Sequence, residues 1–133
     1  MTVQDLADSG LFSILNEGDD MDREITKPFC CDLLSIAMGK APAGCAWVTV
    51  MGNMNTLAVA SLADAACIIM AEDVPLDAVA SGKAKMQGIT VFRTELPIFE
   101  AALAVYRKLG GFDADRPHAD RDKTDGSPAE NSL

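Results

Sequence analysis

Histidine is almost absent from this chain. The single one, His118, lies in a polar C-terminal stretch. Pairs of serine or cysteine with histidine, and metal sites built on imidazole, are therefore excluded from residues 1–110. Two nucleotide-binding motifs are also missing: there is no G-x-x-x-x-G-K-[ST] P-loop and no G-x-G-x-x-G sequence after a strand. We therefore expect a protein that is not an enzyme and that needs no cofactor.

Carboxylates are the acid–base groups that this part of the chain does contain. Sequence alone cannot pair them, and their ordinary role is that of solvated surface acids. Catalysis by carboxylates alone stays open as an alternative for five residues: Glu24, Asp32, Glu72, Asp73 and Glu95.

Basic residues are scarce, with 11 Lys and Arg against 20 Asp and Glu and a net charge of −9. A negative surface argues against nucleic acid, because phosphate neutralisation by basic side chains supplies much of that affinity. No apolar run approaches the roughly 20 residues that cross a bilayer. The N-terminus carries Asp5 and Asp8 without a basic flank, so it does not resemble a signal peptide. We expect a cytoplasmic protein that binds neither nucleic acid nor membrane.

The four cysteines form no recognisable framework. Cytosolic thiols stay reduced, and an adjacent pair followed by two distant single cysteines matches no C-x-x-C metal motif. We expect structural roles for Cys30, Cys31, Cys45 and Cys67 and no metal site. A redox or metal contact at Cys30 and Cys31 stays open as an alternative.

The second half of the chain alternates between β-rich runs and stretches with helical spacing. Such alternation predicts a single α/β domain with a mostly parallel central sheet flanked by helices. Because 49% of residues are hydrophobic and only 5% aromatic, the core should be aliphatic. The expected strands are Cys45–Val50, Cys67–Met70 and Ile89–Arg93, and the expected helices are Met54–Asp64, Pro75–Gln87, opened by its proline and ended by Gly88, and Leu96–Leu109.

The first half is less regular. Thr2 and Asp5 resemble a capping box that begins a short helix ending near Ser9. A strand over Leu11–Leu15, an extended piece over Met21–Thr26 and a helix over Asp32–Met38 follow, and Lys27-Pro28 should end the extended piece. The domain should span residues 1–110, and residues 111–133 should form an acidic, disordered tail.

A first candidate ligand site is the segment from Asp22 to Thr26. Arg23 is suited to an anionic group, with the Thr26 hydroxyl as a second donor and Asp22 beside them. The simpler alternative is that Asp22 and Arg23 form a local ion pair that fixes the turn.

Two further candidate segments follow predicted strands. In open α/β sheets ligands bind outside the carboxyl ends of strands, where helix N-terminal amides face them. Asn53 and Asn55 occupy one such position, although capping of the following helix is the simpler role. Thr94 occupies another, where it is expected to cap the last helix with Pro97 in the first turn.

The same loops carry a resemblance to a known family. The segments 18–26, 32–35, 53–62 and 88–96 together resemble the DRTGG domain family, and the chain is similar to the N-terminal domain of HPr kinase/phosphorylase. The resemblance covers nearly all of residues 1–110. It implies an α/β domain that occurs alone or beside CBS, pyrophosphatase or phosphotransacetylase modules, with a regulatory or dimer-forming role. Stand-alone members are often encoded near hydrogenase-type iron–sulfur redox genes, and the kinase activity of the relatives belongs to a separate P-loop domain.

One position departs from that family. Where the motif continues into two glycines, this chain has Lys27 and Pro28. Pro28 removes a backbone donor and Lys27 adds a side chain, so a backbone anion site would be partly lost or replaced by the Lys27 ammonium.

These observations lead to two functional expectations. The first is a non-catalytic regulatory domain that forms a homodimer and contacts a redox enzyme or another protein partner. Its last helix carries a broad apolar set, which either meets a second subunit or simply packs on the sheet: Ile98, Phe99, Ala101, Ala102, Leu103, Val105 and Tyr106. The second is a sensor that binds an anionic or nucleotide-like small molecule near Arg23, Asn53, Asn55 and Thr94.

Overall fold

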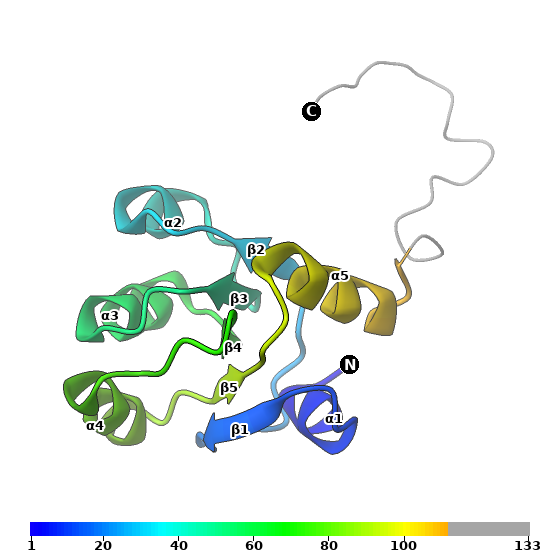
Figure 1. Cartoon of the computed structure of the whole chain (residues 1–133), viewed down its shortest axis with the longest axis horizontal. Helices are drawn as coiled ribbons and strands as arrows, with labels where there is room; N and C mark the ends of the chain where they lie inside the picture. The colour runs from blue at the N-terminus through cyan, green and yellow to red at the C-terminus, as the bar shows by residue number, and fades with distance from the viewer. Residues whose placement is uncertain (112–133) are drawn as a thin grey trace, which may run out of the picture.

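Five strands form one sheet in the computed structural model of the chain, which describes residues 1–111 (Figure 1). The strand order is β1-β5-β4-β3-β2, in which β2 to β5 are parallel and β1 pairs antiparallel with β5. The expectation of an α/β domain with a mostly parallel sheet is therefore confirmed. The strands are β1 (Ser13–Asn16), β2 (Pro28–Cys30), β3 (Ala46–Thr49), β4 (Cys67–Met70) and β5 (Val91–Arg93).

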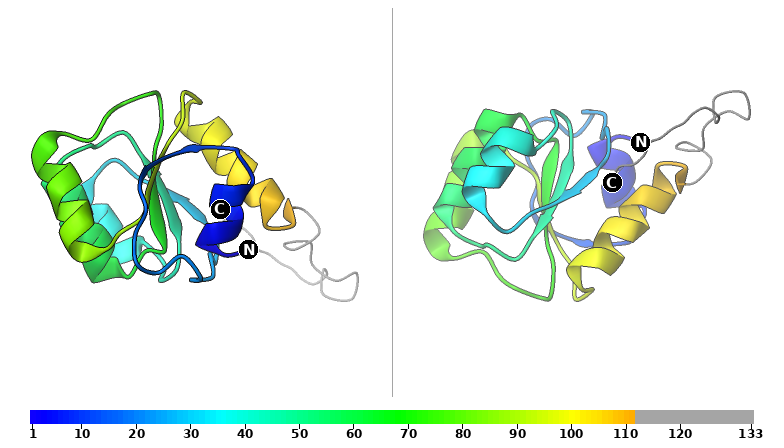
Figure 2. Two further views of the ribbon diagram at one scale, coloured as in Figure 1. Left: turned by 90° about the horizontal axis from the view of Figure 1, so that it is seen from below. Right: turned by 90° about the horizontal axis from the view of Figure 1, so that it is seen from above.

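Helices cover both faces of this sheet, which gives three layers (Figure 2). The helices α2, α3 and α4 connect neighbouring parallel strands that follow one another in a single direction across the sheet. Because such crossovers are right-handed, all three helices lie on the same face. The other face holds α1 and α5. The helices are α1 (Val3–Asp8), α2 (Leu34–Lys40), α3 (Met54–Ala63), α4 (Ala78–Gln87) and α5 (Ile98–Lys108).

The core is divided into two parts by the sheet. Side chains alternate along a strand, so Ile69 and Phe92 pack toward α1 and α5 while Trp47 and Ile68 pack toward α2, α3 and α4. All four residues of β3 and of β4 are buried, as expected for parallel strands covered on both faces. The core is mostly aliphatic, and the indole of Trp47 donates to the Cys31 carbonyl at 2.9 Å.

Several short-range signals are confirmed. The Thr2 and Asp5 side chains each accept from the other residue's backbone N–H, at 3.0 and 2.9 Å, which forms the capping box of α1. Asn53 caps α3, and Gly88 ends α4 with a φ of 66°. These features depend on residues within one turn of each other, so the local sequence determines them.

Two helix starts were predicted wrongly. Pro75 does not open α4; Asp77 does, because its carboxylate accepts from the Ala80 N–H at 2.8 Å. Thr94 does not cap α5, because Pro97 occupies the cap position and the Thr94 hydroxyl accepts from the Leu96 N–H at 3.2 Å.

The strand β2 was missed, because Lys27-Pro28 was expected to end an extended piece rather than to begin a strand. Proline is tolerated here because β2 is an edge strand and Pro28 is its first residue. The Lys27 carbonyl accepts from Ala46 on β3, so the ring nitrogen of the next residue faces away from the sheet. The expected extended piece Met21–Thr26 is not a strand. An isolated bridge joins Glu24 to Thr2, and backbone hydrogen bonds also join the segment to Met1, Val3, Gln4 and Gly44.

The predicted tail lies outside the described residues, apart from Gly111. Within the described part, no helix combines the length and the hydrophobicity that spanning a bilayer requires.

Candidate functional site

The six candidate ligand residues lie at opposite edges of the sheet. Arg23 bonds to Asp64, which precedes β4, and Thr26 bonds to Ala43, which precedes β3, so both residues belong to the amino edge of the parallel strands. Asp22, next to Arg23, is exposed. Asn53, Asn55 and Thr94 follow β3 and β5 and belong to the carboxyl edge. Strands of four residues separate the edges by roughly 13 Å. A small ligand therefore cannot contact both groups, and the single site expected around Arg23, Asn53, Asn55 and Thr94 is not formed.

Arg23 is the best-fixed side chain at the amino edge. Its guanidinium donates to both carboxylate oxygens of Asp64 at 3.0 Å and to the Asp64 carbonyl at 3.1 Å. Asp64 ends α3 with a φ of 62°. The hydrogen bonds from Arg23 lower the pKa of Asp64, and the same bonds raise the pKa of Arg23. The expected local pair with Asp22 is replaced by a bidentate pair that ties the segment before β2 to the end of α3.

The segment that leads to Arg23 lies against the end of α4. The Gly18 N–H donates to the Thr90 hydroxyl and the Asp19 N–H donates to the Gly88 carbonyl, both at 2.9 Å. A Cβ on Gly18 would overlap the Gly88 carbonyl oxygen, so only glycine allows this approach. Gly88 also needs to be glycine, because its φ is positive and the Asp19 carboxylate occupies the space that a Cβ would fill.

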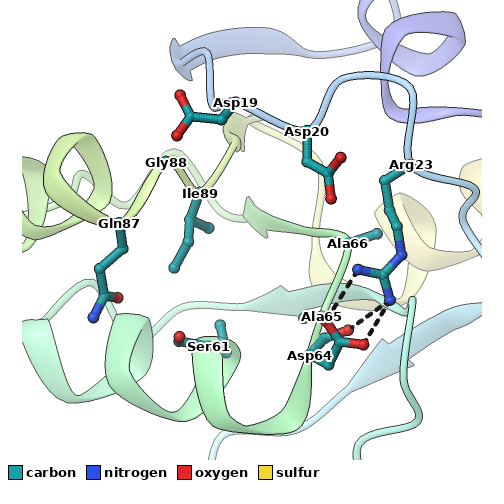
Figure 3. A pocket seen from close by; sticks show the side chains of 11 residues that line it. Asp19, Asp20, Arg23, Ser61, Asp64, Ala65, Ala66, Gln87, Gly88 and Ile89 are labelled. Atoms are coloured by element: carbon teal, nitrogen blue, oxygen red, sulfur yellow. Dashed lines mark hydrogen bonds and ion pairs between the residues drawn. The ribbon is translucent and has the colours of Figure 1, made fainter.

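These elements enclose a cavity of about 320 Å³ (Figure 3). It lies between the ends of α3 and α4 and the segment from Asp19 to Arg23. Asp20 lies beside the guanidinium and helps to raise the pKa of Arg23, while Ser61 and Gln87 supply polar side chains from the two helices. Asp64 already neutralises Arg23, and the carboxylates of Asp19 and Asp20 add negative charge. The cavity therefore favours ligands that donate hydrogen bonds over phosphates. A role for Arg23 in anion binding thus loses its physical basis in this arrangement.

The carboxyl-edge candidates have structural partners as well. The Asn53 side chain accepts from the N–H groups of Asn55 and Thr56 at 2.9 and 3.3 Å, so it satisfies two amides at the start of α3. The Asn55 side chain lies on the exposed surface, in a groove between α2 and α3. The Thr94 side chain is almost buried within its own turn.

A strained turn at this edge was not predicted. Glu72 and Asp73 both adopt a φ of 59°, in a turn closed by the Val74 N–H and the Ala71 carbonyl at 3.1 Å. Non-glycine residues rarely adopt this region, and such strain is commonly found at functional sites. Asp73 also pairs with Arg93, and its N–H donates to the Thr94 carbonyl at 2.8 Å. No glycine or asparagine marks the turn in the sequence, so tertiary contacts alone reveal it.

The cysteine pair does not form a joint site. Cys30 and Cys31 are adjacent at the end of β2, where successive side chains point to opposite faces. Burial and the neighbouring Asp32 raise the pKa of Cys30, so its thiol is not activated as a nucleophile. Burial also raises the pKa of Cys45 to about 11. Within residues 1–111, no three His, Cys, Asp or Glu side chains come together as metal ligands.

An apolar surface on α2 and α3 was also missed by the sequence analysis. Met54, Ala58 and Leu62 lie along the outside of α3, and Leu62 is 73% exposed. Between them and Met38 and Gly39 of α2 runs a groove of about 600 Å³. We call these five residues the α2–α3 face. The signal was present in the sequence, because α3 contains no charged residue and only three polar ones, Asn55, Thr56 and Ser61, whereas a solvated outer helix usually carries charged side chains.

Comparison of the chain with protein-family models and with curated proteins gave no match to either. The resemblance to the DRTGG domain family therefore stays a prediction.

Proposed function

We propose that this chain is a non-catalytic regulatory domain that works through protein contacts and forms a homodimer through the α2–α3 face. The observation that carries the proposal is the outer surface of α3, which presents Met54, Ala58 and Leu62 to solvent without a charged residue along the helix. Monomeric proteins rarely leave such a helix face uncovered.

A second copy of the chain suits this face for two reasons. Met54, Ala58 and Leu62 are spaced four residues apart, so they form a ridge that fits a groove between two helices, and the same face contains such a groove. A surface with both a ridge and a groove is self-complementary, as a two-fold interface requires. No charged residue lines the groove, so two chains of net charge −9 can meet there without opposing like charges directly.

The expected dimer surface on α5 receives less support. Ala101 and Val105 are buried, and α5 packs against β2 and β3, so most of its apolar set serves the core. Phe99 is the member that stays exposed, at 69%.

The partner of the dimer is proposed from the resemblance alone. Stand-alone members of the DRTGG family are often encoded beside hydrogenase-type iron–sulfur redox genes, and an accessory role beside such an enzyme fits a domain that binds proteins. The same resemblance supports a regulatory role rather than a catalytic one.

Sedimentation equilibrium of the full chain tests the dimer. We expect a dimer whose dissociation constant rises about 100-fold in Leu62→Glu, because a charge in an apolar interface opposes its two-fold mate. Met86→Glu is the matched control, since Met86 lies on the neighbouring helix α4, is 87% exposed and does not line the groove. A wild-type chain that stays monomeric at high concentration would rule out the dimer, and dissociation by both variants would remove the α2–α3 face as its interface.

A ligand-sensing function is the alternative, and the strained turn at Glu72 and Asp73 favours it. The Asp73 N–H of this turn donates to the Thr94 carbonyl. A small anionic or nucleotide-like molecule bound at the carboxyl edge would therefore lie against a strained segment of backbone. A ligand that binds only the folded state raises the melting temperature by mass action. Unchanged melting with adenine nucleotides and inorganic phosphate would count against this alternative.

A further inference from the structure

We propose that the cavity beside Lys27 binds a small amphipathic monocarboxylate. This cavity has a volume of about 450 Å³, within the range of small-molecule sites. It lies at the amino edge of the sheet, between the segment that leads into β2 and the end of α5. It is separate from the cavity of Figure 3 and from the α2–α3 face, so the inference does not depend on the proposed dimer.

Apolar groups form about half of the surface that lines this cavity, and polar groups form the rest. Ile25, which is buried, and Pro28 come from the segment around β2, and Leu109 comes from the end of α5. Met1, Tyr106 and Gly111 also line the cavity, together with Thr26 and Lys27. This apolar half is suited to the hydrocarbon part of a ligand, and the polar half is suited to a polar head group.

Lys27 gives the cavity a single available positive charge. Arg23 lines the cavity of Figure 3 and Arg93 lies at the carboxyl edge, and both are in ion pairs, with Asp64 and Asp73. Lys27 is exposed and has no ion pair within residues 1–111. The N-terminal ammonium of Met1 is close by, but it already pairs with Glu24 at 3.3 Å.

The charge distribution selects the class of ligand. One unpaired ammonium beside a partly apolar wall matches one carboxylate on a body that is partly apolar. A polyphosphate would bring several charges to a cavity that can neutralise one, in a chain with a net charge of −9. The Thr26 hydroxyl donates to the Ala43 carbonyl at 2.9 Å, so it does not provide a second donor for an anion.

Calorimetric titration of the full chain with octanoate tests this inference, with octanamide, ATP and inorganic phosphate as comparison probes. We expect octanoate to bind and octanamide to bind about 10-fold more weakly, because the amide lacks the charge that strengthens the hydrogen bond to Lys27. ATP and phosphate should give no heat at the same concentration. Lys27→Gln should weaken octanoate binding by a similar factor.

Two control variants distinguish binding in this cavity from binding of the alkyl chain at the α2–α3 face. Lys40 is an exposed lysine at the end of α2, so Lys40→Gln is the matched control for the charge. Leu62→Glu is the control for the groove. Both should leave octanoate binding unchanged. Absence of binding, equal affinity for octanamide, or a loss in these controls rather than in Lys27→Gln would each overturn the inference.

Discussion

At the scale of single residues, the pair of Arg23 and Asp64 shows how a charged side chain becomes part of the scaffold. The two residues are 41 positions apart, and three hydrogen bonds join them. Arg23 is largely covered, whereas the Asp64 side chain is 65% exposed. Bidentate geometry lets such a pair stabilise the fold more than an ordinary surface ion pair does, although solvent screening limits this stabilisation.

This pair predicts a pH-dependent stability. The folded pKa of Asp64 is lowered by the hydrogen bonds from Arg23, so the ionised carboxylate favours the folded state. Its contribution is complete above the unfolded value of 3.8 and is lost as the pH falls through the lower folded pKa. Urea unfolding should show that Asp64→Asn lowers the free energy of unfolding by about 1 kcal/mol or less at pH 7.

The same experiment at pH 3 should give a smaller difference, because wild-type Asp64 is then increasingly protonated. A difference that grows toward low pH would show that the carboxylate does not act through Arg23. Asp22→Asn is the matched control, since Asp22 is exposed and the structure gives it no hydrogen bond within the described residues.

At the scale of elements, the contact between the segment at Gly18 and the end of α4 positions the cavity of Figure 3. The contact is made by backbone groups, through the bonds of Gly18 to Thr90 and of Asp19 to Gly88. It holds only where a side chain does not intervene, so it depends on glycine at both sides.

Gly18→Ala should therefore destabilise the fold by about 1–3 kcal/mol, because its Cβ would overlap the Gly88 carbonyl oxygen and lie 2.7 Å from the Thr90 nitrogen. Gly82→Ala is the matched control. Gly82 lies inside α4, and a Cβ there meets no atom within 4 Å, so the substitution should stabilise by about 0.5–1 kcal/mol through helix propensity. Denaturant unfolding measures both, and an equal effect of the two substitutions would contradict the steric reason.

The elements also show which parts of the fold the sequence could predict. The buried strands β3 and β4 and the helix α3 between them were predicted, because continuous apolar runs and helical spacing are local patterns. The cap at Asn53 and the stop at Gly88 are local as well. The strand β2 was missed because its proline is acceptable only at the start of an edge strand, and edge position is a property of the whole sheet.

The candidate site was less predictable for a similar reason. Sequence spacing located Arg23 and Asn53 in loops, but only the parallel arrangement of β2 to β5 decides which edge each loop occupies. The partner of Arg23 lies at the end of a helix far along the chain, which no local pattern could identify. The strained turn at Glu72 and Asp73 carries no glycine, so its sequence gave no sign of it.

At the scale of the whole molecule, charge and apolar surface are separated. Negative charge dominates the chain, while the α2–α3 face contains no charged residue. If two copies meet at this face, the attraction is hydrophobic and the repulsion comes from the net charge of −9 on each chain.

This separation predicts how salt should act on the proposed dimer. Raising sodium chloride from about 0.01 M to about 0.15 M shortens the Debye length from roughly 30 Å to roughly 8 Å, so repulsion between the two chains is screened. The dissociation constant should therefore fall as salt rises, as measured by sedimentation equilibrium. In Leu62→Glu the fall should be steeper, because that variant places like charges near each other at the interface. If salt instead dissociated the wild-type dimer, charged pairs rather than the α2–α3 face would hold the two copies together.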